Sequence, residues 1–120
     1  MSLTATPVEE ALQRGINYKI EGLYDEAIAQ FQVFLAEQPD HPRARMELGL
    51  VYGFIGLFDE SIAELERAVL LAPRCVEMRS HLAMTYCMLG MVEEARAEFE
   101  RVLEQEPGNG DALQQLEYLT

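Results

Sequence analysis

The sequence has few basic residues, few cysteines and no tryptophan. Nine lysines and arginines stand against 21 acidic residues, so the formal net charge of the 120-residue chain is −12. A chain with this charge repels a phosphate backbone, and nucleic acid is excluded as the expected partner. No run of 18 apolar residues occurs, so no membrane-spanning helix is expected. The opening MSLTATPVEE lacks the basic and apolar stretches of a secretory signal, which favours a cytoplasmic location.

The small number of cysteines and histidines leaves little material for catalysis or metal binding. Cys75 and Cys87 lie on one expected helix, where ~1.5 Å per residue separates them by about 18 Å, too far for a disulfide. His81 and Cys87 point about 120° apart on that helix, so they do not form a nucleophile–base pair. A soft-metal site would need His81, Cys87, Met84 and Met88, which span too much of the helix circumference. We therefore expect no enzyme activity, no cofactor and no metal.

What the sequence does contain is a repeat with a period of 34 residues. Small, aromatic and helix-breaking residues each recur three times at this spacing, and a fixed period of this size predicts stacked supersecondary units. The recurring positions are Gly15, Gly49 and Ala83; Tyr18, Tyr52 and Tyr86; Gly22, Gly56 and Gly90; Ala27, Ser61 and Ala95; and Pro39, Pro73 and Pro107.

Each repeat contains two helical patterns. Helices are expected at about 8–21, 25–37, 42–55, 59–71, 76–89 and 93–105, with a short last helix at about 111–119. Thr6 is expected to cap the first helix, and His41 to lie at the start of the third. The recurring small residues predict a close crossing of the two helices in each pair. The tyrosines, together with Phe31 and its counterparts Leu65 and Phe99, are expected to fill the space around that crossing.

In these motifs the chain resembles the tetratricopeptide repeat family, whose pattern places Trp, Leu-Gly, Tyr, Ala, Phe and Pro at set offsets. The resemblance covers residues 8–109. The family's tryptophan is replaced by Ala11, Arg45 and Arg79. The resemblance implies an all-α fold, a right-handed α-solenoid of three antiparallel helix pairs. It implies a single domain over 1–120, with repeats at about 8–41, 42–75 and 76–109 and a cap helix at about 111–119.

The resemblance also implies a binding site, because the first helices of this family line a concave groove. The resemblance therefore implies a non-catalytic protein–protein interaction module that binds a peptide or amphipathic segment of a partner protein. Mapping the period onto the first helices gives an i, i+4, i+8 stripe with a polar rim. The same stripe is also compatible with packing between neighbouring helices. The candidate groove residues are Leu12, Ile16, Ile20, Arg43, Met46, Glu47, Leu50, Phe54, His81, Met84 and Met88, with Leu50 and Phe54 as central anchors.

Other functions known in this family require particular residues, sizes or charges that can be compared with this chain. Members that clasp acidic chaperone tails use a lysine–asparagine–asparagine–lysine–arginine set, and none of its five residues is retained at the matching positions. Small acidic chaperones of bacterial secretion systems are similar in size and charge. A self-assembling scaffold, a homo-oligomer formed through the solenoid ends, is the other alternative. The matching positions of the acidic-tail clamp are Leu12, Ile16, Glu47, Glu77 and His81.

The negative charge is concentrated on the second helices, since residues 25–37, 59–71 and 93–106 together carry −10 of the net −12. A solvated outer face that keeps the protein soluble explains this distribution. A docking surface for a basic partner is the alternative.

Overall fold

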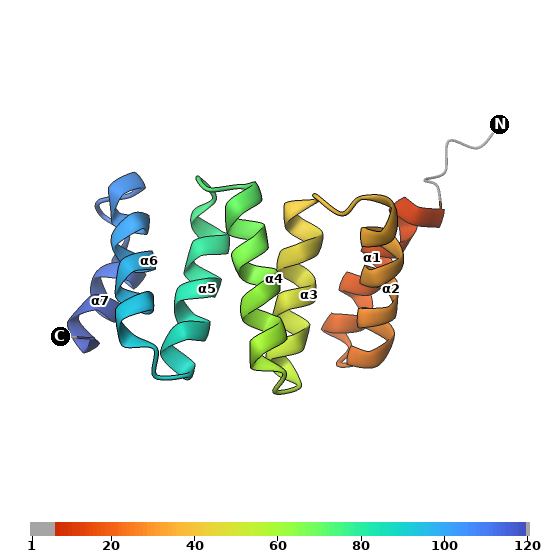
Figure 1. The fold of residues 1–120 in the computed structure, drawn as a ribbon, viewed down its shortest axis with the longest axis horizontal. Helices are drawn as coiled ribbons and strands as arrows, with labels where there is room; N and C mark the ends of the chain where they lie inside the picture. Colours follow the sequence, from red (N-terminus) through yellow and green to blue (C-terminus); the bar gives the residue numbers. More distant parts are fainter. Residues whose placement is uncertain (1–6, 120) are drawn as a thin grey trace.

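The computed structural model describes residues 7–119, and over this range the chain forms seven α-helices. They stand side by side as three antiparallel pairs, α1–α2, α3–α4 and α5–α6, followed by α7 (Figure 1). The array measures 56 × 29 × 22 Å. The predicted all-α solenoid is confirmed. The helices are α1 (Pro7–Ile20), α2 (Tyr24–Glu37), α3 (Pro42–Phe54), α4 (Phe58–Leu71), α5 (Val76–Met88), α6 (Val92–Gln105) and α7 (Gly110–Tyr118).

The first helix of each pair ends at a glycine in the left-handed conformation. Gly22 has φ +79°, and its counterparts Gly56 and Gly90 have +83° and +73°. The Leu23 N–H donates to the Tyr18 carbonyl at 2.9 Å and the Gly22 N–H to the Lys19 carbonyl at 3.0 Å. These two bonds satisfy the last carbonyls of the helix. The same pair of bonds recurs in the other two repeats, so the predicted helix ends are confirmed to within one residue.

Among α2 to α7, two helices begin at a side-chain cap. His41 Nδ1 accepts a hydrogen bond from the Ala44 N–H at 3.1 Å, which confirms its predicted place at the start of α3. Asn109 Oδ1 accepts from the Ala112 N–H at 2.9 Å. This cap starts α7 at Gly110, one residue before the expected start. The predicted cap at Thr6 lies outside the described residues.

The close crossing of paired helices depends on small residues, as predicted. A Cβ atom placed on Gly15 would lie 2.5 Å from the Phe31 ring, and one on Gly49 would lie 2.9 Å from Leu65 Cγ. Both distances are too short for a side chain, so only glycine allows the second helix this close. The Ser61 hydroxyl also donates to the Gly49 carbonyl at 2.7 Å across the second crossing.

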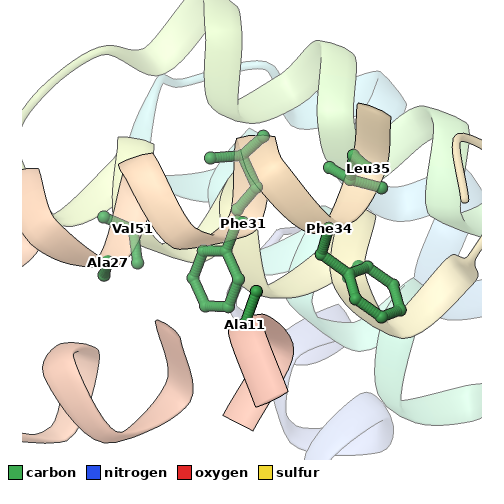
Figure 2. Close-up of a cluster of buried hydrophobic side chains, with 8 residues drawn as sticks. Ala11, Ala27, Phe31, Phe34, Leu35 and Val51 are labelled. Carbon is green, nitrogen blue, oxygen red and sulfur yellow. The ribbon is translucent and has the colours of Figure 1, made fainter. Parts of the chain in front are cut away.

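The first of these crossings lies in a buried apolar cluster. Phe31 is fully buried, and Figure 2 shows its ring beside Ala11. Tyr18 and Tyr52 pack against this cluster, and Tyr86 is buried in the next one. The recurring tyrosines therefore belong to the core, as predicted, and do not form a row for binding a ligand.

Arginines occupy two of the family's tryptophan positions, and they link the second and third helix pairs to the turns that precede them. Arg45 Nε donates to the Pro39 carbonyl at 2.9 Å, while its Nη1 lies 2.9 Å from Glu64 Oε1. Arg79 repeats both contacts one repeat later, with Pro73 at 2.9 Å and Glu98 at 2.7 Å. Each of these two guanidiniums thus joins a turn, a first helix and a second helix through charge-assisted hydrogen bonds.

Candidate protein-binding groove

A hollow of about 170 Å³ opens between α3, the start of α4, and α5. It lies on the side of the array where successive first helices contact one another. Five of the predicted groove residues meet at this hollow, and four others line it with them. The lining residues are Leu50, Gly53, Phe54, Phe58, Ser61, His81, Met84, Thr85 and Met88.

The hollow has an apolar floor that is open to solvent. The exposed fraction is 58% for Phe54, 65% for Met88 and 41% for Met84. Leu50 is partly buried and packs against the second core cluster. The ring of Phe54 also lies 5.6 Å from that of Tyr24 at a tilted angle, which holds it in place from the first repeat. An apolar side chain entering the hollow would contact both an aromatic ring and flexible methionines.

The predicted groove residues of the first repeat lie elsewhere. Leu12 and Ile16 are partly buried against the first core cluster, and Ile20 is exposed beyond them. Met46 differs most from the prediction, because it is 1% exposed and packs among α4 and α5 residues such as Leu65. Met46 is therefore a core residue in this structure, and its side chain offers no contact to a ligand.

Glu47, predicted on the rim, is also buried, with 1% of its side chain exposed. Its carboxylate accepts from Lys19 Nζ at 2.6 Å and from Arg43 Nε at 3.2 Å. Two cations around one carboxylate satisfy the buried charge and tie α1 to α3. Of this trio only Arg43 is largely exposed, with 52% of its side chain accessible.

His81 completes the polar side of the hollow. Its Nε2 lies 3.9 Å from Glu77 Oε1. Burial lowers the pKa of His81 below its ordinary value of 6.5, and Lys19 and Arg43 act in the same direction while Glu77 and Glu47 oppose them. The imidazole is therefore neutral at pH 7, so the hollow presents a neutral ring to a ligand.

The lowered pKa of His81 predicts a pH-dependent stability. The unfolded chain binds a proton at His81 near pH 6.5 while the folded chain resists it, so stability falls as pH drops below 6.5. His81→Gln should remove this component. Urea denaturation of wild type and His81→Gln at pH 7.5 and pH 5.5 measures it. Equal pH dependence in wild type and His81→Gln would contradict the assignment.

Of the four other lining residues, Gly53 falls at a rim position of the repeat period, whereas three were not predicted from the sequence: Phe58, Ser61 and Thr85. The predicted groove positions all lie on first helices, whereas Phe58 and Ser61 belong to the first turn of α4. A second, wider hollow of about 640 Å³ lies between α4, α5 and α6, and it was also not predicted. Its wall includes the 78%-exposed Leu70 and the Arg79–Glu98 ion pair.

Over residues 7–119, no three His, Cys, Asp or Glu side chains gather where they could bind a metal ion. No helix in this range has the length and apolar content needed to cross a membrane. Cys75 and Cys87 are free thiols, as their spacing predicts. Burial raises the pKa of the Cys87 thiol.

Two family models match different parts of the chain and carry the same description. A family model described as tetratricopeptide repeat matches residues 56–117, and a second with the same description matches residues 12–52. No curated protein sequence matches the chain.

Three solved structures illustrate the similarity. The first TPR domain of Spaghetti (RPAP3) bound to the HSP90 peptide SRMEEVD is 26% identical, with a TM-score of 0.86 over 94% of this chain and 90% of that one. The second TPR domain of human RPAP3, in complex with the HSP70 peptide SGPTIEEVD, is 25% identical, with a TM-score of 0.84 over 94% of each chain. MamA is 25% identical, with a TM-score of 0.88 over 93% of this chain and 66% of that one.

Proposed function

This chain belongs to the tetratricopeptide repeat family, and on that premise we propose that it is a non-catalytic protein-interaction module. Its ligand is a segment of a partner protein that places an apolar side chain in the hollow between α3 and α5. The observation that supports this most directly is the exposure of Phe54, Met84 and Met88 around one opening. Clustered apolar side chains of this kind are typical of protein-binding sites.

The ligand chemistry differs from that of the two similar domains named with chaperone peptides. Those peptides, SRMEEVD and SGPTIEEVD, end in two glutamates, a valine and an aspartate. In this chain Lys19 and Arg43, the cations that act on His81 at the hollow, are both engaged by Glu47. Because Glu77 also lies beside His81, this part of the hollow offers an acidic peptide little net attraction. We therefore propose a peptide with apolar anchors, such as one face of an amphipathic helix.

Selection of ligands from a random peptide library tests the proposed function. Wild type should select peptides with apolar anchors and show no saturable binding of SRMEEVD up to about 1 mM. Met84→Glu should weaken the selected peptides at least ~10-fold, about 1.4 kcal/mol, because it puts a charge on the apolar floor. Leu70→Glu, at a 78%-exposed position on α4 outside this hollow, is the matched control. Equal affinity of wild type and a folded Met84→Glu variant would refute the site.

A self-assembling scaffold is a second candidate function, favoured by the last helix. Leu113 and Tyr118 of α7 are 48% and 72% exposed. Such side chains at the end of a repeat array can bury one another between two copies. Sedimentation equilibrium of wild type beside a Leu113→Ser, Tyr118→Ser variant tests this function. A wild-type monomer at all concentrations would contradict it, and an oligomer that the variant dissolves would support it.

A further inference from the structure

The exposed apolar side chains of the described residues are concentrated at one edge of the array. Of the thirteen large apolar side chains that are exposed there, eight lie at the three turns that join a first helix to a second helix. Figure 1 shows these turns along one long edge, opposite the turns that join successive pairs. This surface is called the turn edge below. Its eight residues are Ile20, Leu23, Phe54, Ile55, Leu57, Met88, Leu89 and Val92.

Single exposed apolar residues are ordinary on protein surfaces, but a cluster of this kind is not. The fold partly explains why positions 23 and 57 are apolar. Leu23 and Leu57 follow the left-handed glycines, where an apolar side chain commonly packs back on its own helix. The fold does not explain the apolar residues Ile20 and Met88 in this way, because they are 74% and 65% exposed. Because the position recurs as Ile20, Phe54 and Met88, all exposed, the row continues through all three repeats.

Acidic side chains flank this row in every repeat. Each second helix has two acids in its first turn, where they also favour the positive end of the helix dipole. Over residues 7–119 the one ion pair made by these six acids is that of Glu93 with Arg96. The turn edge therefore combines an apolar row with unneutralised negative charge. The acids are Asp25, Glu26, Asp59, Glu60, Glu93 and Glu94.

The apolar row and the negative charge together decide which kind of partner fits the turn edge. Two copies joined edge to edge would bring six acids against six acids, which is unfavourable. An anionic membrane surface would be repelled for the same reason. A helix with one apolar face and lysines or arginines beside it complements both features, because its apolar face covers the row while its cations reach the acids. We propose that the turn edge is a second docking surface, for a basic amphipathic helix of a partner protein.

The proposed surface does not depend on the proposed function of the hollow. Phe54 and Met88 border both, but Ile20, Ile55 and Leu89 belong to the turn edge alone. Conversely, Met84 lines the hollow and is not part of the turn edge. Variants at these positions therefore separate the two sites.

The test uses a labelled synthetic helix of about 18 residues, roughly five turns, built from leucine and lysine with all leucines on one face. One control probe has the same composition in an order without an apolar face, and another replaces every lysine by glutamate. The proteins are wild type, the turn-edge variant Ile20→Ser, Ile55→Ser, Leu89→Ser, and the controls Met84→Ser and Leu70→Ser. Fluorescence anisotropy gives the affinities at low and high salt, and circular dichroism verifies that each variant is folded.

We expect wild type to bind the amphipathic basic helix, and to bind it more weakly as salt screens the acids. The turn-edge variant should lose at least ~10-fold in affinity, about 1.4 kcal/mol, while Met84→Ser and Leu70→Ser stay within about twofold of wild type. Equal binding by wild type and the turn-edge variant would overturn the proposal, as would equal binding of the two basic probes. A loss confined to Met84→Ser would place the probe in the hollow, overturning this proposal while supporting the proposed function.

Discussion

Phe31→Ala is expected to lower the free energy of unfolding by about 4 kcal/mol, the largest loss for any single core side chain in the first repeat. The Phe31 side chain is fully buried. It also fills the space directly beside Gly15, where a Cβ atom would lie 2.5 Å from its ring. Alanine would leave a cavity at the crossing of α1 and α2, and the glycine opposite has no side chain that could move in to fill it.

Urea denaturation of Phe31→Ala beside Val33→Ala measures this effect. Val33 lies on the same helix but is 50% exposed, so its truncation should cost less than about 1 kcal/mol. Because stability in stacked repeats is partly local, hydrogen exchange should show the largest loss of protection in α1 and α2. A loss below about 1 kcal/mol for Phe31→Ala would mean that α1 and α2 move together and fill the cavity. The helices are already in close contact at Gly15, so this result would contradict the predicted packing.

The helices were predictable because local chemistry ends them. Gly22 and its counterparts have a positive φ that other residues rarely adopt, and His41 caps α3 through its own ring. The helix crossing was predictable for a similar reason, since Gly15 is small where the bulky Phe31 has to fit. These features are encoded within a few residues or by one repeated spacing, and the structure agrees with them to within one residue at the helix ends.

The surroundings of individual groove residues were less predictable. A spacing of four places Met46 and Leu50 on one helix face, but it does not say how far α4 and α5 cover that face. Met46 is buried beneath those helices, whereas Phe54, two turns further along the same helix, is 58% exposed. Burial on a solenoid depends on the neighbouring repeat, and one helix's periodicity contains no information about it.

The charge cluster around Glu47 shows the same limit. Arg43 and Glu47 are four residues apart on α3, so their pairing could be predicted from the sequence. Lys19 comes from α1, 28 residues before Glu47 in the chain, and its contact depends on how the two first helices stack. The sequence therefore suggested an exposed acid on the rim, and the stacking of α1 against α3 made it a buried one.

Glu47→Ala is expected to cost about 3 kcal/mol of stability, the second largest effect, because breaking a buried ion pair leaves an uncompensated charge. The carboxylate is 1% exposed, and Lys19, 19% exposed, would keep its ammonium beside an apolar space. Arg43 can turn toward solvent, since half of its side chain is already accessible. The remaining cost therefore falls mainly on Lys19, and Lys19→Met in the Glu47→Ala background should restore part of the loss.

A matched surface pair supplies the control. Arg14 and Glu10 also form an ion pair four residues apart, but their side chains are 43% and 47% exposed. Glu10→Ala should therefore cost no more than about 0.5 kcal/mol of stability, and this small cost should disappear in high salt. Chemical denaturation of both variants at low and high salt makes the comparison. If Glu47→Ala costs as little as Glu10→Ala, solvent reaches the Glu47 site in solution and α1 is not held on α3 by this cluster. If the loss stays near 3 kcal/mol in high salt, the buried carboxylate fixes the first helix against the second repeat.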